Sequence, residues 1–130
     1  MDQNKIIIDE HIQCTEHDDY ENWTRQVDKQ TFNILSLNIR SLAKHWDELK
    51  LIICNAEVEL DVIILTETNI RDSNENLFFL NNYDSFFQNR VERRGGGVAV
   101  FIKTEYKATR IKVIGLLNYE NIEIKIKLKN

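Results

Sequence analysis

The pattern of hydrophobic and polar positions changes at Thr31. Before it, residues 1–30 hold one short apolar run, Ile6–Ile8, and then a polar, acidic stretch without a sustained period. Such a stretch is typical of a loosely ordered segment. From Thr31 onward, apolar runs of strand length alternate with polar loops and one segment of helical period. We therefore predict an acidic leader over 1–30 and a folded unit over 31–130.

Residues 31–66 predict a strand, a helix and a second strand. Phe32–Asn38 is a short β-type run, and Asp61–Thr66 is a continuous apolar run of the kind found in strands buried on both faces. Between them, Ser41 can cap a helix over about Leu42–Asn55. Its apolar residues form one stripe: Leu42, Trp46, Leu49, Ile52 and Ile53. The economical interpretation is a βαβ unit with a right-handed crossover and two parallel strands.

This topology places two polar residues at the carboxyl ends of the parallel strands. Asn38 ends the first strand and Glu67 follows the second. Ligands of open α/β sheets bind at that edge, so Glu67 is a candidate metal or substrate carboxylate and Asn38 its polar neighbour. The alternative is that residues 66–69 form a hydrated loop facing solvent. Topology alone leaves both interpretations open, and the loop is the simpler one.

The next part of the chain predicts a β-hairpin. A polar loop runs from residue 69 to about 82, and the apolar run Leu77–Leu80 inside it is expected to fold back on the body. Two strands, Tyr83–Arg90 and Val98–Lys103, then flank a turn. Gly95–Gly97 suit that turn because glycine accepts positive φ without a Cβ penalty. The spacing of a phosphate-binding P-loop and its following helix are both missing, so turn chemistry is favoured.

Two more strands are expected near the end of the sequence. One covers Ala108–Ile114, and the other covers Asn121–Lys129, where isoleucine and leucine alternate with charged residues. The alternation is typical of a half-buried antiparallel strand. No later sequence supplies a layer for its apolar face or its edge, and such surfaces invite association. We therefore expect either self-association through the last strand or a missing C-terminal half.

Composition narrows the class of protein. The 130 residues are the length of one domain, and 42% hydrophobic with 29% charged residues is ordinary globular usage. No apolar run approaches the roughly 18 residues that a membrane span needs, and no signal peptide is evident. Cys14 and Cys54 lie far apart, which favours a reduced, intracellular chain, nuclear or cytoplasmic. His11, Cys14 and His17 could suggest zinc, but the second ligand pair of a zinc site is missing, which favours a polar tail.

Charge is unevenly distributed over the folded unit. Residues 31–87 carry nine acids against four bases, whereas residues 88–130 carry ten bases against four acids. An acidic centre beside a basic flank suits a site that holds a cation and approaches a polyanion, although an uneven solvated surface explains the pattern equally well. Beside the predicted turn, Arg90, Arg93 and Arg94 are candidates for contact with a nucleic-acid backbone.

Three blocks of the sequence resemble a known family. Residues Asn33–Leu42 contain "LNIRSL", residues Asp61–Thr68 contain "LTET", and residues Arg93–Ile102 contain "RGGGVA". In this order and spacing they resemble the N-terminal half of the endonuclease/exonuclease/phosphatase family. Within it they are most similar to the apurinic-type endonuclease domain of non-LTR retrotransposons.

The resemblance implies part of a four-layer α/β sandwich that hydrolyses phosphate esters with Mg²⁺ or Mn²⁺. It makes Glu67 the metal-binding glutamate and Asn38 the asparagine that contacts the metal site or the scissile phosphate, and it makes DNA the expected partner. A single carboxylate suits Mg²⁺, which keeps several waters and is often held by one or two carboxylates plus substrate phosphate. Position 40 is arginine, where some branches of the family have an acid or asparagine.

The later blocks of the family, including its catalytic histidine, match no stretch of this sequence. Since the loss of a general acid–base group costs orders of magnitude in rate, we expect the 130-residue chain alone to be inactive. Two alternatives stay open. One is a non-catalytic nucleic-acid-binding remnant, and the other is a phosphatase branch of the same family.

Overall fold

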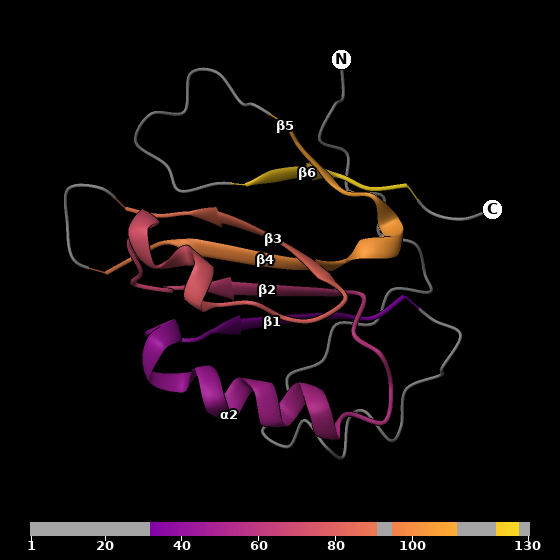
Figure 1. The fold of residues 1–130 in the computed structure, drawn as a ribbon, viewed down its shortest axis with the longest axis horizontal. Coiled ribbons are helices and arrows are strands. Elements are labelled where there is room, and N and C mark those ends of the chain that lie inside the picture. Colours follow the sequence, from indigo (N-terminus) through magenta and orange to yellow (C-terminus); the bar gives the residue numbers. More distant parts are fainter. Residues whose placement is uncertain (1–31, 91–94, 112–121, 128–130) are drawn as a thin grey trace.

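The computed structural model describes residues 32–90, 95–111 and 122–127 of the chain. Figure 1 shows their arrangement. The elements, in chain order, are β1 (Ile34–Asn38), α2 (Leu42–Asn55), β2 (Val62–Thr66), the 3₁₀ helix η1 (Asp72–Leu77), β3 (Tyr83–Gln88), β4 (Val98–Lys103), the 3₁₀ helix η2 (Thr104–Tyr106), β5 (Thr109–Ile111) and β6 (Glu123–Lys125). The predicted mixed α and β class is confirmed, and the predicted helix has the bounds of α2.

Four strands form one mixed sheet in the order β1-β2-β4-β3. β1 and β2 are parallel, whereas β4 is antiparallel to both of its neighbours, β2 and β3. Helix α2 connects the two parallel strands, because parallel strands need a long crossover and cannot be joined by a tight turn. The predicted strand–helix–strand unit and the following hairpin are therefore confirmed. The four-layer arrangement stays a prediction.

Helix α2 packs its apolar stripe on one face of this sheet. At its start, the hydroxyl of Ser41 accepts a hydrogen bond from the amide of Lys44 (3.3 Å), as expected of an N-cap. Leu42 and Leu49 are fully buried, and Trp46 packs beside them at the boundary of the core. The sheet contributes to this core through Leu35, Ile63, Leu65, Ala99 and Phe101. Within the described residues, no helix is long and apolar enough to cross a membrane.

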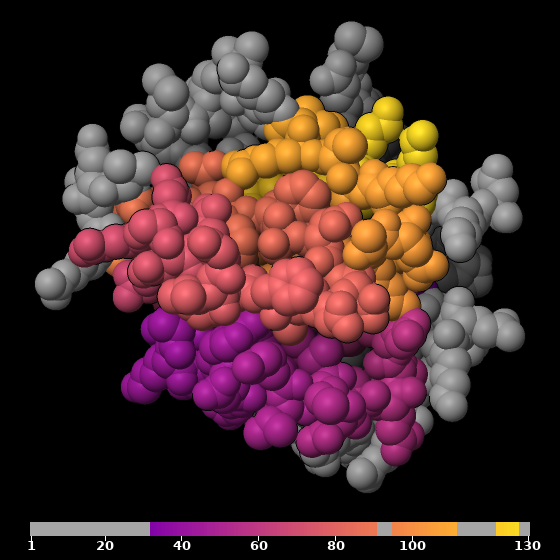
Figure 2. All heavy atoms as spheres, in the orientation of Figure 1, coloured from indigo at the N-terminus to yellow at the C-terminus, as the bar shows by residue number. Residues whose placement is uncertain are grey.

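The loop between β2 and β3 differs from its prediction in two ways. It contains η1, which the polar sequence did not indicate. The apolar run that follows folds back only in part: Phe78 and Leu80 are buried, but Leu77 and Phe79 are about 70% exposed. Phe78 meets Trp46 of α2 edge to face, with ring centroids 5.2 Å apart. The space-filling view accordingly shows the segment around η1 lying against α2 (Figure 2).

The second face of the sheet is covered by β5 and β6, which pair antiparallel as a two-stranded sheet. Figure 1 shows this pair and α2 on opposite sides of the four strands. Three isoleucines at alternating positions, Ile122, Ile124 and Ile126, pack against Val62, Val100 and Ile102. The expectation that the last strand lacks a partner layer is therefore wrong, because that layer is the chain's own main sheet. β6 is also shorter than predicted, and residues 112–114 and 128–129 of the two predicted strands lie outside the described residues.

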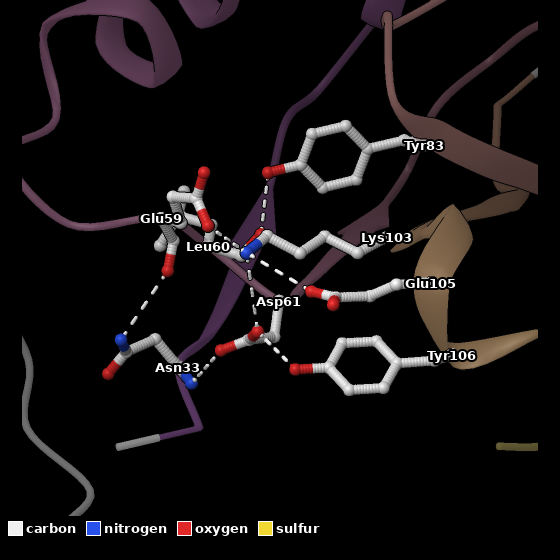
Figure 3. Close-up of polar contacts among 8 residues, drawn as sticks. All are labelled: Asn33, Glu59, Leu60, Asp61, Tyr83, Lys103, Glu105 and Tyr106. Carbon is white, nitrogen blue, oxygen red and sulfur yellow. Dashed lines mark hydrogen bonds and ion pairs between the residues drawn. The ribbon is translucent and has the colours of Figure 1, made fainter. Parts of the chain in front are cut away.

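A polar network closes the end of the sheet where β1 and β2 begin (Figure 3). Asp61 is 6% exposed, and its carboxylate accepts hydrogen bonds from the amide of Asn33 (2.7 Å) and the hydroxyl of Tyr106 (2.5 Å). The ammonium of Lys103 lies 3.7 Å from Asp61 and also pairs with Glu59. A buried carboxylate is tolerated only with such partners. This network therefore ties β1, β2 and η2 together.

Candidate functional site

At one edge of the four-stranded sheet, the strands β1, β2 and β3 end and β4 begins. Asn38, the last residue of β1, pairs with Thr66 at the end of β2. Thr66 also pairs with Val98, the first residue of β4, and Val98 pairs with Gln88, the last residue of β3. These residues form one row across the sheet. The loops that follow β1 and β2 and the connection from β3 to β4 therefore begin or end at the same edge.

Backbone hydrogen bonds join the loop after β1 to the loop after β2. They run from Ile39 N to Thr66 O (3.0 Å), from Ser41 N to Glu67 O (2.9 Å) and from Leu42 N to Thr68 O (2.9 Å). The second and third of these bonds use amides at the start of α2 that have no partner inside the helix. Glu67 is therefore held beside the start of α2 by its own backbone carbonyl, while its side chain is exposed.

The loop after β2 is joined in the same way to the glycines before β4. The amide of Thr68 donates to the carbonyl of Gly97 (3.3 Å), and the amide of Asn69 donates to that of Gly96 (2.8 Å). The side-chain oxygen of Asn69 accepts from the amide of Gly95 (2.9 Å). The three glycines have φ between 69° and 92°, which supports their predicted place in a turn. They also anchor the loop that carries Glu67.

Backbone strain is concentrated at this edge. Among the described residues, six non-glycine residues have positive φ, and four of them lie here: Arg40 (49°), Ser41 (104°), Glu67 (53°) and Asn69 (52°). Such conformations are disfavoured for residues with a Cβ atom, and they cluster at functional sites, where the surrounding structure holds them in place. The concentration of strain around Glu67 marks this edge as the candidate site.

A hollow with a volume of about 670 Å³ opens at the same edge. Its lining residues are Arg40, Ser41, Thr66, Glu67, Asn69, Arg90, Gly95, Gly96, Gly97 and Val98. Three of them are charged, namely Arg40, Glu67 and Arg90. One acidic and two basic residues therefore border one solvent-accessible space, and such a site can receive a cation and an anion together.

The candidate residues identified from the sequence differ in whether they line this hollow. Glu67 and Arg90 line it. Asn38 is exposed at the same edge, paired with Thr66, but it is not among the lining residues. Arg93 and Arg94 lie outside the described residues. Their proximity to nucleic acid stays a prediction.

Several lining residues were not singled out as site residues from the sequence. Arg40 and Ser41 follow the end of β1 directly, and Asn69 follows the block that contains Glu67. Their position next to the strand ends could have identified them from the sequence. Their left-handed backbone could not be predicted, because it depends on hydrogen bonds between loops that are far apart in sequence.

The donor set at this edge restricts which metal the site could hold. Within the described residues, no group of three or more histidine, cysteine, aspartate or glutamate side chains could enclose a metal ion. Glu67 supplies a single exposed carboxylate to the hollow. That set does not fit zinc, which needs about four nitrogen or sulfur ligands. It fits Mg²⁺ or Mn²⁺ held by one carboxylate, waters and a substrate phosphate.

One comparison with solved structures bears on the fold of the chain. No protein-family model matches the chain, and no curated protein matches it either. Among solved structures, the AP endonuclease LMAP from Leishmania major matches 61% of the chain at 19% sequence identity with a TM-score of 0.52. The catalytic domain of APE2 from Xenopus laevis matches 58% at 27% identity with a TM-score of 0.48.

The first of these matches establishes that the chain shares its fold with part of an AP endonuclease. The chain spans only about a quarter of the two solved structures, 27% of the former and 26% of the latter. At this identity, the likeness concerns the fold and not the chemistry, since one fold hosts many functions.

Proposed function

We propose that this chain is part of a Mg²⁺- or Mn²⁺-dependent DNA endonuclease domain of the endonuclease/exonuclease/phosphatase type, related to those of non-LTR retrotransposons. The observation that carries the proposal is the position of Glu67. It is an exposed carboxylate at the carboxyl end of a buried parallel strand, in a strained loop, and it shares a hollow with two arginines. The three sequence blocks and the shared fold agree with it.

In this proposal, each residue has a role that its chemistry suits. Glu67 holds the divalent ion through its carboxylate. The ion, when bound, supplies charge neutralisation at the phosphate and orientation of the attacking water. Asn38, at the end of the neighbouring strand, offers an amide to the scissile phosphate. Arg90, and with it Arg93 and Arg94, contacts the nucleic-acid backbone through charge-assisted hydrogen bonds.

We further propose that this chain binds its ligands without hydrolysing them efficiently. The one histidine among the described residues is His45, which lies on α2 and contacts Glu48 at 3.3 Å. It does not line the hollow. The described part of the site therefore offers no histidine as a general base, a group whose contribution is typically 10²- to 10⁴-fold.

Metal binding tests the proposal without requiring activity. Mn²⁺ is paramagnetic and broadens the NMR signals of nearby amides. We expect broadening at residues 67–69 and 95–97, and none at Asp61 at the opposite end of the sheet. Glu67→Gln should abolish it, and Glu123→Gln, which alters an exposed carboxylate on β6, should not. A spectrum that Mn²⁺ leaves unchanged, or changes equally in Glu67→Gln, contradicts the metal site.

A non-catalytic nucleic-acid-binding function is the second candidate, and the lack of a histidine among the described residues that line the hollow favours it. It predicts DNA binding that weakens with salt but no metal at Glu67. DNA binding together with an unchanged spectrum in the Mn²⁺ experiment would select this candidate. A phosphatase branch of the family would instead bind Mn²⁺ and show no preference for DNA.

A further inference from the structure

The candidate hollow contains opposite charges that do not neutralise each other. Arg40 and Glu67 both line it, and both are exposed. Within the described part of the chain, the ion pairs involve other residues, and neither of these two side chains has a hydrogen-bond partner. The guanidinium is therefore available to an anion while the carboxylate is available to a cation.

The backbone holds these two side chains in a defined relation. Arg40 has φ of 49°, and the residues on either side of it are bonded to the loop after β2. The amide of Ile39 donates to Thr66, and the amide of Ser41 donates to Glu67 itself. The base of the Arg40 side chain is therefore tied to the base of the Glu67 side chain by a short covalent and hydrogen-bonded path.

Three amides at the start of α2 already have hydrogen-bond partners. The amides of Ser41 and Leu42 already donate to backbone carbonyls, and the amide of Lys44 donates to the hydroxyl of Ser41. These three amides are therefore not free to bind an anion, whereas the side chain of Arg40 is exposed at the hollow. A guanidinium presents planar, paired donors that match two phosphate oxygens.

We propose that Arg40 binds the substrate phosphate and at the same time disfavours metal binding to Glu67 while that phosphate is absent. This inference rests on the proposed function and deepens it. A fixed positive charge repels a divalent ion in the empty hollow, and the bound phosphate neutralises that charge. Phosphate and metal then bind cooperatively, so the metal is held more firmly once the substrate is present.

The inference predicts effects of opposite sign from a single substitution. Arg40→Asn removes the charge, and asparagine tolerates a left-handed backbone. DNA affinity, measured in EDTA with a short fluorescein-labelled duplex, should fall about tenfold, as expected for one lost charge-assisted contact. The salt dependence should lose about 0.9 of a unit of slope. Affinity for Mn²⁺ without DNA should rise on the order of threefold, because a nearby like charge is gone.

Lys107→Asn is the matched control. Lys107 is also an exposed cation in the left-handed region (φ 47°), but it follows η2 and does not line the hollow. The affinities of Lys107→Asn for DNA and for Mn²⁺ should stay within about twofold of the wild type, since the long-range effect of one charge is weak. If Arg40→Asn does not fold, Arg40→Gly gives the same test, since glycine adopts this conformation without strain.

The outcomes separate this inference from the proposed function. Weaker DNA binding with tighter Mn²⁺ binding supports it, because a merely damaged fold would weaken both. Two results overturn the inference and leave the proposed function standing. One is that both affinities of Arg40→Asn stay within twofold of the wild type. The other is that the asparagine and glycine variants both lose affinity for DNA and for Mn²⁺. A wild type that binds neither ligand overturns the proposed function itself, and the inference with it.

Discussion

A Cβ atom built on Gly97 would lie 2.5 Å from the hydroxyl oxygen of Thr68. The loop before β4 and the loop after β2 therefore approach each other more closely than any side chain at position 97 allows. Thr68 is fully buried, and within the described residues its hydroxyl has no hydrogen-bond partner. The contact lies directly beside Glu67 in the chain.

Gly97→Ala should lower the free energy of unfolding by about 2–4 kcal/mol, combining the cost of a positive φ with that of an overpacked contact. Gly95→Ala is the matched comparison. Gly95 also has positive φ (84°), but nothing lies within 4 Å of its Cβ position. Its alanine variant should therefore cost only about 1–2 kcal/mol. Urea unfolding measures the stability of both variants. Equal losses of stability would show that the contact between position 97 and Thr68 contributes nothing.

Asp61→Asn should destabilise the fold by about 2–4 kcal/mol, because it leaves Lys103 with less compensating charge and cannot satisfy the same hydrogen bonds. Asp47→Asn provides the comparison, since Asp47 is exposed on α2 and pairs only with Lys50. Surface pairs of this kind contribute at most about 1 kcal/mol. Denaturant unfolding of the two variants distinguishes the sites, and a loss below about 1 kcal/mol for Asp61→Asn would contradict the role of the network.

Stability should fall as the pH rises above about 10. Burial and the hydrogen bond to Asp61 raise the pKa of Tyr106 above its ordinary value of 10.0. Burial also raises the pKa of Tyr83. The unfolded chain therefore releases these protons at a lower pH than the folded chain does, and the linked stability is lost between the unfolded and the folded pKa. Thermal unfolding between pH 9 and pH 11 follows this loss.

Tyr106→Phe removes one of the two tyrosine contributions and should give a shallower decline of stability above pH 10. The raised pKa of Lys103 also makes the folded chain less stable as the pH rises. Burial alone would lower its pKa, but the hydrogen bond to Glu59 and the neighbouring carboxylates outweigh that effect and raise it. A pH profile that Tyr106→Phe leaves unchanged would show that the hydroxyl of Tyr106 is not held by Asp61.

Purified chain should not nick supercoiled plasmid in Mg²⁺ above an EDTA control, because the hollow contains no histidine within the described residues. Gel electrophoresis of the plasmid over time measures this. Nicking that requires both the metal and Glu67, and that disappears in Glu67→Ala, would show that the chain is catalytic as it stands. The account of its missing general base would then be wrong.

The local elements could be predicted because their signals lie within short stretches of sequence. The stripe from Leu42 to Ile53 predicts α2 through its period alone, and Ser41 marks the start. The run before Glu67 predicts a strand buried on both faces, since its residues are apolar without alternation. By contrast, η1 has no apolar period. It is held by tertiary hydrogen bonds from Asn89 to Asp72 and Glu75, which cannot be predicted from the local sequence.

The sequence by itself determined the strand–helix–strand unit, the hairpin after it, and the placement of Asn38 and Glu67 at strand ends. Each of these depends on periodicity and on the rule that parallel strands end at a common edge. The tertiary structure alone decided that Arg40 and Asn69 join Glu67 and Arg90 around one hollow. It also decided that the last strand packs on the chain's own sheet. Both depend on contacts between loops and faces distant in sequence, whose geometry no local pattern encodes.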